Sequence, residues 1–267
     1  MELNEMFNKI INDYFEIMRN KSFKVSINLT LTNDIYDKRM QIGTKEQKED
    51  IGSNDQLKNW ANNLNATLVN PDDYDGTYNV LMNEKYFLDN YGFNNNWVGT
   101  ICHELTHICD FIDYANITKQ NKFSMMLKHE SYKMFYFWTE YNARRIGYRF
   151  LRKYTYVNMS VESQLEFIMH TELPFHVKDY NDNYILCTSV REQIYSTMQF
   201  LGHLKTWKEL FPEQFTALYI ETVIGNLNAA SFWINKIFEF LDENDTFEKA
   251  YPRFSEMGDI LATNFAL

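Results

Sequence analysis

The chain has 267 residues, of which 45% are hydrophobic and 16% aromatic, so it can bury a sizeable core and is expected to be a folded globular protein. Its formal net charge of −10 opposes binding to phosphate backbones and to anionic membrane surfaces, so neither nucleic acid nor a membrane is an expected partner. Only 9 glycines and 4 prolines occur, and no stretch has the composition of a flexible linker, which predicts one compact unit with two lobes.

The N-terminal residues 1–18 lack the basic start and the continuous apolar core of a secretory signal peptide. No stretch reaches the roughly 20 apolar residues that are needed to cross a bilayer. The cysteines are odd in number and sparse, which is not the pattern of a disulfide framework; they are Cys102, Cys109 and Cys187. We therefore expect a cytoplasmic protein.

The first third of the chain shows both periods of regular secondary structure. Apolar residues spaced by three and four predict an amphipathic helix over residues 2–19. Over residues 22–32 the period changes to two, which predicts a strand with one buried face; the alternating apolar residues are Phe23, Val25, Ile27, Leu29 and Leu31. A short helix over residues 56–64 and two short strands over 66–70 and 77–83 follow, and the turn-forming stretch PDDYDG separates these strands.

After Tyr91 the pattern is helical almost to the end of the chain, and residues 94–96 are three asparagines suited to cap the first of these helices. The expected fold class is α+β. A small N-terminal mixed lobe with a short sheet, residues 1–115, precedes a mostly helical lobe, residues 116–267.

The stretch ICHELTHICDF, residues 101–111, contains two histidines four positions apart, His103 and His107. At about 100° per residue both lie on one side of a helix with Asp110, while the apolar residues gather on the opposite side. Two imidazoles on successive turns can reach one cation at the Zn–N distance of about 2.0–2.1 Å. Glu104 points about 100° away, where a carboxylate lies beside the metal and can take a proton from water. The alternative is an ordinary core helix that carries two histidines.

His103, Glu104 and His107 make an H-E-x-x-H match. On these residues the sequence resembles the zincin superfamily of zinc metallopeptidases. The resemblance implies one zinc ion per chain, a zincin-like fold with a sheet before the active-site helix, and hydrolysis of a peptide bond. It extends over residues 97–147, whereas residues 151–267 match no known pattern.

The third metal ligand distinguishes the branches of this superfamily. The metzincin-like pattern would place it at Asp113, but Asp110 stands where that pattern needs a glycine for a sharp backbone turn. The gluzincin-like pattern takes a glutamate from a later helix, and Glu140 lies in such a predicted helix among aromatic residues, with Ala143 one turn after it. Because a buried carboxylate is costly without a partner, an acid in this setting suggests a nearby cation; the alternative is a surface glutamate. The thermolysin-type pattern also has an Asp four residues after the glutamate, where this chain has Arg144.

A peptidase of this type also needs a hydrogen-bond donor that stabilises the oxyanion. The candidates are His170, His176, Tyr195 and His203. We favour Tyr195 and His203, which both lie in the predicted helix over residues 191–207.

Asp110 and a basic cluster each allow two interpretations. Asp110 either orients one of the imidazoles or is a solvated acid at the helix end. A basic cluster forms either a solvated helix face near a C-terminal dipole or an anchor for a substrate carboxylate; it comprises Arg144, Arg145, Arg149, Arg152 and Lys153.

The strand over residues 77–83 directly precedes the H-E-x-x-H helix. Zincins bind extended peptide along a sheet edge by backbone pairing. We therefore expect the backbone of Val80–Met82 to line the substrate groove.

The function predicted from these residues is a gluzincin-like zinc peptidase with a peptide or protein substrate. His103, His107 and Glu140 are the expected ligands, and Glu104 is the expected general base. The first alternative is a zincin-fold regulator or partner-binding protein that holds metal without turnover. The second is a helical protein without metal, in which the aromatic-rich C-terminal lobe supplies a binding surface. The oligomeric state is not predicted.

Overall fold

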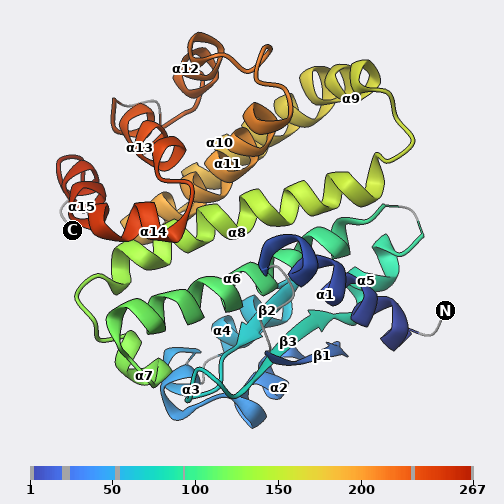
Figure 1. Ribbon diagram of the computed structural model, residues 1–267, viewed down its shortest axis with the longest axis vertical. Helices are drawn as coiled ribbons and strands as arrows, with labels where there is room; N and C mark the ends of the chain where they lie inside the picture. The colour runs from blue at the N-terminus through green and yellow to red at the C-terminus, as the bar shows by residue number, and fades with distance from the viewer. Residues whose placement is uncertain (1–2, 20–24, 52–54, 93, 230–231, 266–267) are drawn as a thin grey trace. The chain divides into compact units, whose positions relative to one another are not determined.

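Strands occur early in the chain and long helices dominate the rest, which confirms the α+β class (Figure 1). The computed structural model describes residues 3–19, 25–51, 55–92, 94–229 and 232–265. The chain divides into two compact units, Met1–His129 and Glu130–Leu267. The expected lobe boundary after Ala115 falls inside a helix that continues to Thr118.

The described residues of the first unit form one three-stranded sheet. Its strands are β1 (Ser26–Thr32), β2 (Ala66–Val69) and β3 (Thr77–Asn83), in the spatial order β1-β3-β2. β1 runs parallel to β3, and β2 runs antiparallel to β3. All three predicted strands are therefore confirmed, although residues 22–24 of the first prediction, including Phe23, lie outside the described residues.

The two faces of the sheet pack against different helices, because successive side chains of a strand point to opposite faces. Leu81 of β3 and Val69 of β2 form a small core with Ile35 of α2 (Ile35–Ile42). Tyr78, on the other face of β3, has its pKa raised by burial and by the nearby Cys109 of α6 (Asn96–Thr118). The helices α2 and α6 thus cover opposite faces (Figure 1).

The central position of β3 corrects the expected substrate groove. β3 pairs with β1 on one side and with β2 on the other, so the backbone of Val80–Met82 is hydrogen-bonded on both sides. A peptide cannot add to a strand that has no free edge. The groove prediction for this segment is wrong, because the order of strands along the chain does not reveal which strand lies at an edge.

β1 lies at an edge of the sheet, and this position weakens the expected buried face. The apolar residues Ile27, Leu29 and Leu31 alternate as predicted, but each is only partly buried. An edge strand has a covering neighbour on one side only, so its side chains keep more contact with water than those of β3.

Seven helices of the first unit are described, and α1 packs against α6. The residues Phe7, Ile10 and Tyr14 of α1 are buried, and the Tyr14 hydroxyl donates a hydrogen bond to Thr106 Oγ1 of α6 at 2.9 Å. The predicted N-terminal helix is thereby confirmed, apart from Glu2, which lies outside the described residues. The helices are α1 (Leu3–Arg19), α2 (Ile35–Ile42), α3 (Lys45–Ile51), α4 (Asp55–Asn62), α5 (Glu84–Asn90), α6 (Asn96–Thr118) and α7 (Phe123–Met126).

Every described element of the second unit is a helix. A single π-helical turn, η1, joins two of them, and a 3₁₀ turn, η2, precedes the last. The elements are α8 (Tyr132–Thr155), α9 (Val161–Phe167), η1 (Ile168–Glu172), α10 (Leu173–Leu186), α11 (Val190–Leu210), α12 (Ala217–Gly225), α13 (Phe232–Glu243), α14 (Phe247–Ala250), η2 (Tyr251–Arg253) and α15 (Phe254–Ala262).

α8 and α11 lie side by side and pack closely (Figure 1). At the point of closest approach α11 carries Gly202. A Cβ atom there would lie 2.7 Å from the carbonyl oxygen of Tyr141 and 2.8 Å from Cβ of Arg144. The Thr206 hydroxyl, one turn further along α11, donates a hydrogen bond to the Arg145 carbonyl oxygen at 3.0 Å. The absence of a side chain at position 202 therefore sets the spacing of the two helices.

The basic cluster of α8 is not a solvated helix face. Arg145 is buried and pairs with Glu209 at 3.2 Å, and Arg152 is buried and pairs with Glu172 at 2.6 Å. Arg149 and Lys153 are exposed. Two members of the cluster form ion pairs inside the unit. A count of charges along the sequence does not distinguish such buried residues from a basic surface stripe.

In the described parts of the chain no helix combines the length and the apolar character that crossing a membrane requires. All three cysteines lie among the described residues and none forms a disulfide; Cys102 and Cys109 are buried in α6.

Replacing Gly202 with Ala should lower the free energy of unfolding by about 1–3 kcal/mol, because the added methyl group meets backbone and Cβ atoms that cannot rotate away. Denaturant unfolding of the two proteins measures this difference. Gly225→Ala is the matched control, since a Cβ there meets nothing within 4 Å. Equal stability of the Gly202→Ala protein and the wild type would show that the two helices can separate at little cost.

Candidate metal centre

α6 carries the two histidines, and its first turn is fixed by one of the expected asparagines. The Asn94 side chain accepts a hydrogen bond from the backbone N–H of Asn96 at 3.0 Å, which satisfies one of the free donors at a helix start. The helix ends where Lys119 adopts a left-handed conformation with φ of 59°. The helix thus begins within the predicted region 94–96, with Asn95 at the N-cap, and the side-chain bond to its first N–H comes from Asn94 and not from the N-cap residue.

α6 is buried on both its apolar and its polar side. Leu105 and Ile108, on the predicted apolar side, are fully buried. His107 and Glu104 are only 7% exposed, and Asp110 is 4% exposed. Because α6 continues two turns beyond Asp110 to Thr118, this residue is not a solvated acid at a helix end, and that alternative is wrong. Polar side chains buried on a helix need partners, since each loses its contact with water.

The imidazoles of His103 and His107 converge through the same ring atom. Their Nε2 atoms lie 3.0 Å apart, and the ring centroids are 4.6 Å apart with the planes nearly perpendicular. Two nitrogens at this separation can both reach one cation at about 2.1 Å. One Nε2 can donate a hydrogen bond to the other, and the two rings point to a common position.

Glu140 of α8 is a buried acid, 7% exposed, rather than a surface glutamate. The amide Nε2 of Gln199 on α11 donates a hydrogen bond to Glu140 Oε2 at 2.7 Å. Burial raises the pKa of the Glu140 carboxyl to about 7, and the positive charge of Arg144 and the hydrogen bonds from Gln199 and Tyr195 act in the opposite direction. A cation beside this carboxyl would favour its ionised form further.

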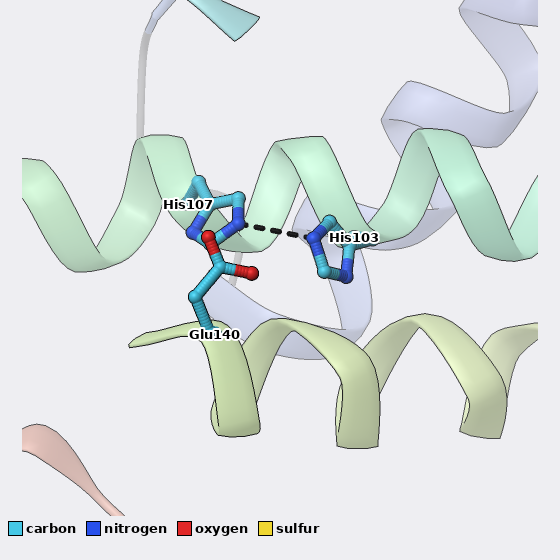
Figure 2. A group of neighbouring side chains, drawn as sticks. All are labelled: His103, His107 and Glu140. Atoms are coloured by element: carbon cyan, nitrogen blue, oxygen red, sulfur yellow. Dashed lines mark hydrogen bonds between the residues drawn. The ribbon is translucent and has the colours of Figure 1, made fainter. Parts of the chain in front are cut away.

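His103, His107 and Glu140 form a group of side chains able to hold a metal ion. One ligand atom from each lies within 4.8 Å of the ligand atoms of the others, and Figure 2 shows the three side chains pointing toward one another. Among the described residues Asp113 is not a member of this group. Two imidazole nitrogens and one carboxylate oxygen are a donor set that suits zinc. The residues present therefore fit the metal that the sequence predicts, while the identity of the ion stays a prediction.

The residues predicted to stabilise an oxyanion have different surroundings. Tyr195 of α11 hydrogen-bonds to the Glu140 carboxyl and stacks on Tyr136, with ring centroids 6.4 Å apart. His203 is buried, and its ring stacks on that of His176 at 4.2 Å. His170 lies exposed in the π-helical turn. The catalytic roles of Tyr195 and His203 stay predictions.

Gln199 is the residue of this site that sequence reasoning missed. It lies four positions after Tyr195 and four before His203, so it shares their face of α11, and this spacing was the available signal. No local pattern indicates that this face meets Glu140, because the contact joins residues far apart in the sequence. A glutamine is also an unremarkable surface residue by type.

No protein-family model matches this chain, and neither a curated protein nor a solved structure matches it. The resemblance to zincins therefore stays a prediction. Any function has to be inferred from the residues of the site.

Stability should depend on pH through His176, which packs against His203 and Tyr148. Burial, assisted by the positive charge of Arg144 and opposed by Glu172 and Asp179, lowers the pKa of His176 to about 4. Since the unfolded chain binds the proton near pH 6.5 and the folded chain does not, stability is full above pH 6.5 and falls as the pH drops toward 4. The loss from this residue should be on the order of 3 kcal/mol.

His176→Phe keeps a ring in the stack and removes the titrating group, so its unfolding free energy should fall less between pH 7 and 4.5 than that of the wild type. Denaturant unfolding at a series of pH values measures both. His170→Gln is the control at an exposed histidine and should follow the wild-type curve. Parallel curves for His176→Phe and wild type would contradict the prediction.

Proposed function

We propose that the protein is a zinc-dependent peptidase in which His103, His107 and Glu140 hold the metal and Glu104 acts as the general base. The observation that carries the proposal is the grouping of the three ligand atoms within 4.8 Å, with an acid directly after the first histidine. A purely structural metal site has no use for such an acid beside an open coordination position.

The residues divide the chemistry between them. When bound, zinc would polarise the carbonyl of the scissile peptide and lower the pKa of a water molecule in its fourth position. The Glu104 carboxylate accepts the proton of the attacking water and passes it to the leaving amine. Its burial, at 7% exposure, excludes bulk water from the carboxylate and strengthens its interaction with a proton donor.

The substrate and the compartment are further parts of the proposal. A peptide or protein is the expected substrate because the H-E-x-x-H arrangement is typical of peptide hydrolysis. Three cysteines without a disulfide between them fit a reducing compartment such as the cytoplasm. The net charge of −10 supports neither nucleic acid nor an anionic membrane as a partner.

Purified without chelator or nickel resin, the wild-type protein should contain about one zinc ion per chain by elemental mass spectrometry. Glu140→Ala should lose the metal because one of three ligands is removed. Asp113→Ala is the control and should keep it, since Asp113 is outside the group of ligand atoms. Wild type that holds no zinc even after zinc is supplied would refute the metal centre and leave the protein without this function.

Glu104→Gln should keep zinc but lose peptidase activity by a factor of about 10²–10⁴, because an amide cannot accept the proton from water. Cleavage of a peptide library, followed by mass spectrometry and paired with metal analysis of the same samples, measures both properties. Undiminished cleavage by the Glu104→Gln protein would rule out the proposed base. A wild type that holds zinc and cleaves nothing would favour the alternative of a metal-binding regulator.

A further inference from the structure

The Gln199 side chain of α11 donates a hydrogen bond from Nε2 to Glu140 Oε2 at 2.7 Å, beside the hydrogen bond that Tyr195 makes to the same carboxyl. We infer that Gln199 is a positioning residue, which fixes the Glu140 carboxylate so that its other oxygen, Oε1, faces the cation. This inference rests on the proposed metal centre, and it assigns a residue that the H-E-x-x-H motif and its expected third ligand do not include.

The orientation of the Gln199 amide is determined by its second partner. Arg144 Nε donates a hydrogen bond to Gln199 Oε1. A guanidinium has donors and no acceptor, so the oxygen end of the amide must face Arg144. The NH₂ end is then the one that faces Glu140, and it can only donate to the carboxylate. The chain Arg144–Gln199–Glu140 therefore has one direction of donation throughout.

The backbone holds this chain of side chains in place. Glu140 and Arg144 lie four residues apart on α8, so they share one face of the helix. Gly202, less than one turn after Gln199, allows α11 to approach α8 so closely that a Cβ would be 2.8 Å from Arg144 Cβ. The hydroxyl of Thr206 adds a hydrogen bond between the helices. The amide thus reaches the carboxylate from a rigid element and not from a loop.

A neutral donor suits this position. A carboxylate that ligates a metal needs its second oxygen held, because otherwise it can rotate and bind in more than one way. An amide N–H orients that oxygen while leaving the negative charge for the cation. A cationic donor in direct contact would neutralise part of the negative charge of the carboxylate. Here the guanidinium of Arg144 bonds to the Gln199 amide, and the amide bonds to Glu140.

The test compares zinc affinity in Gln199→Met and wild type by competition with a chromophoric chelator, in the full-length chain with zinc alone as the probe. Met keeps the length and packing of the side chain but cannot donate a hydrogen bond. We expect a loss of about 10–100-fold in zinc affinity. Gln193→Met is the matched control on the same helix, about 120° around from Gln199, and should bind zinc as the wild type does.

A packing role alone would leave the zinc affinity of Gln199→Met unchanged, and that result would overturn the inference. The visible spectrum of the Co²⁺-substituted protein gives a second readout: a changed coordination at Glu140 should shift its bands in Gln199→Met and leave them in place in Gln193→Met. If Gln199→Met does not fold, Gln199→Asn replaces it, since the shorter amide cannot span the same distance. Absence of zinc from the wild type would instead refute the proposed metal centre itself.

Discussion

Burial of the Glu140 carboxylate is the constraint on which the rest of the proposed metal centre depends. A carboxylate that is 7% exposed costs several kcal/mol unless charge and hydrogen bonds compensate it. Within the second unit the compensation comes from Gln199, Tyr195 and Arg144. Gln199 and Tyr195 are neutral donors, and Arg144 bonds to Gln199 and not to the carboxylate itself. They hold the acid in place without neutralising its charge fully. A cation would complete the balance, so the burial of Glu140 supports the proposed metal site independently of the motif.

The contact between α8 and α11 is made by side chains that recur every four residues on each helix. Tyr136 contacts Tyr195, Glu140 bonds to Gln199, and the ring of Tyr148 lies 4.3 Å from that of His203. Since residue numbers rise together along the two helices, they run parallel, and a shift of one helix by a turn would separate every pair at once. The residues at this interval of four are Tyr136, Glu140, Arg144, Tyr148 and Arg152 on α8, and Arg191, Tyr195, Gln199, His203 and Trp207 on α11.

Local periodicity predicted the strands, the helix α6 and the convergence of His103 with His107, because each depends on neighbours within a few residues. Glu140 was indicated by the resemblance to gluzincins, with its aromatic surroundings in one helix as local support. Local periodicity does not predict features that depend on residues far apart in the sequence. The central position of β3 requires knowing that β1 pairs with it across a long connection. The burial of Arg145 requires Glu209, and the role of Gln199 requires Glu140.

Arg144 shows how a departure from a motif can have a structural reason. The thermolysin-type pattern has an acid four residues after the glutamate ligand, and this chain has a base there. An acid at this position would repel the buried Glu140 one turn away, whereas Arg144 attracts it and bonds to Gln199. In this chain the hydrogen bond of Gln199 and the charge of Arg144 thus act on Glu140, the proposed carboxylate ligand. It follows that Arg144 and Gln199 depend on each other: an acid at position 144 would leave the Gln199 amide free to turn its oxygen toward the carboxylate of Glu140, and the two acceptors would repel.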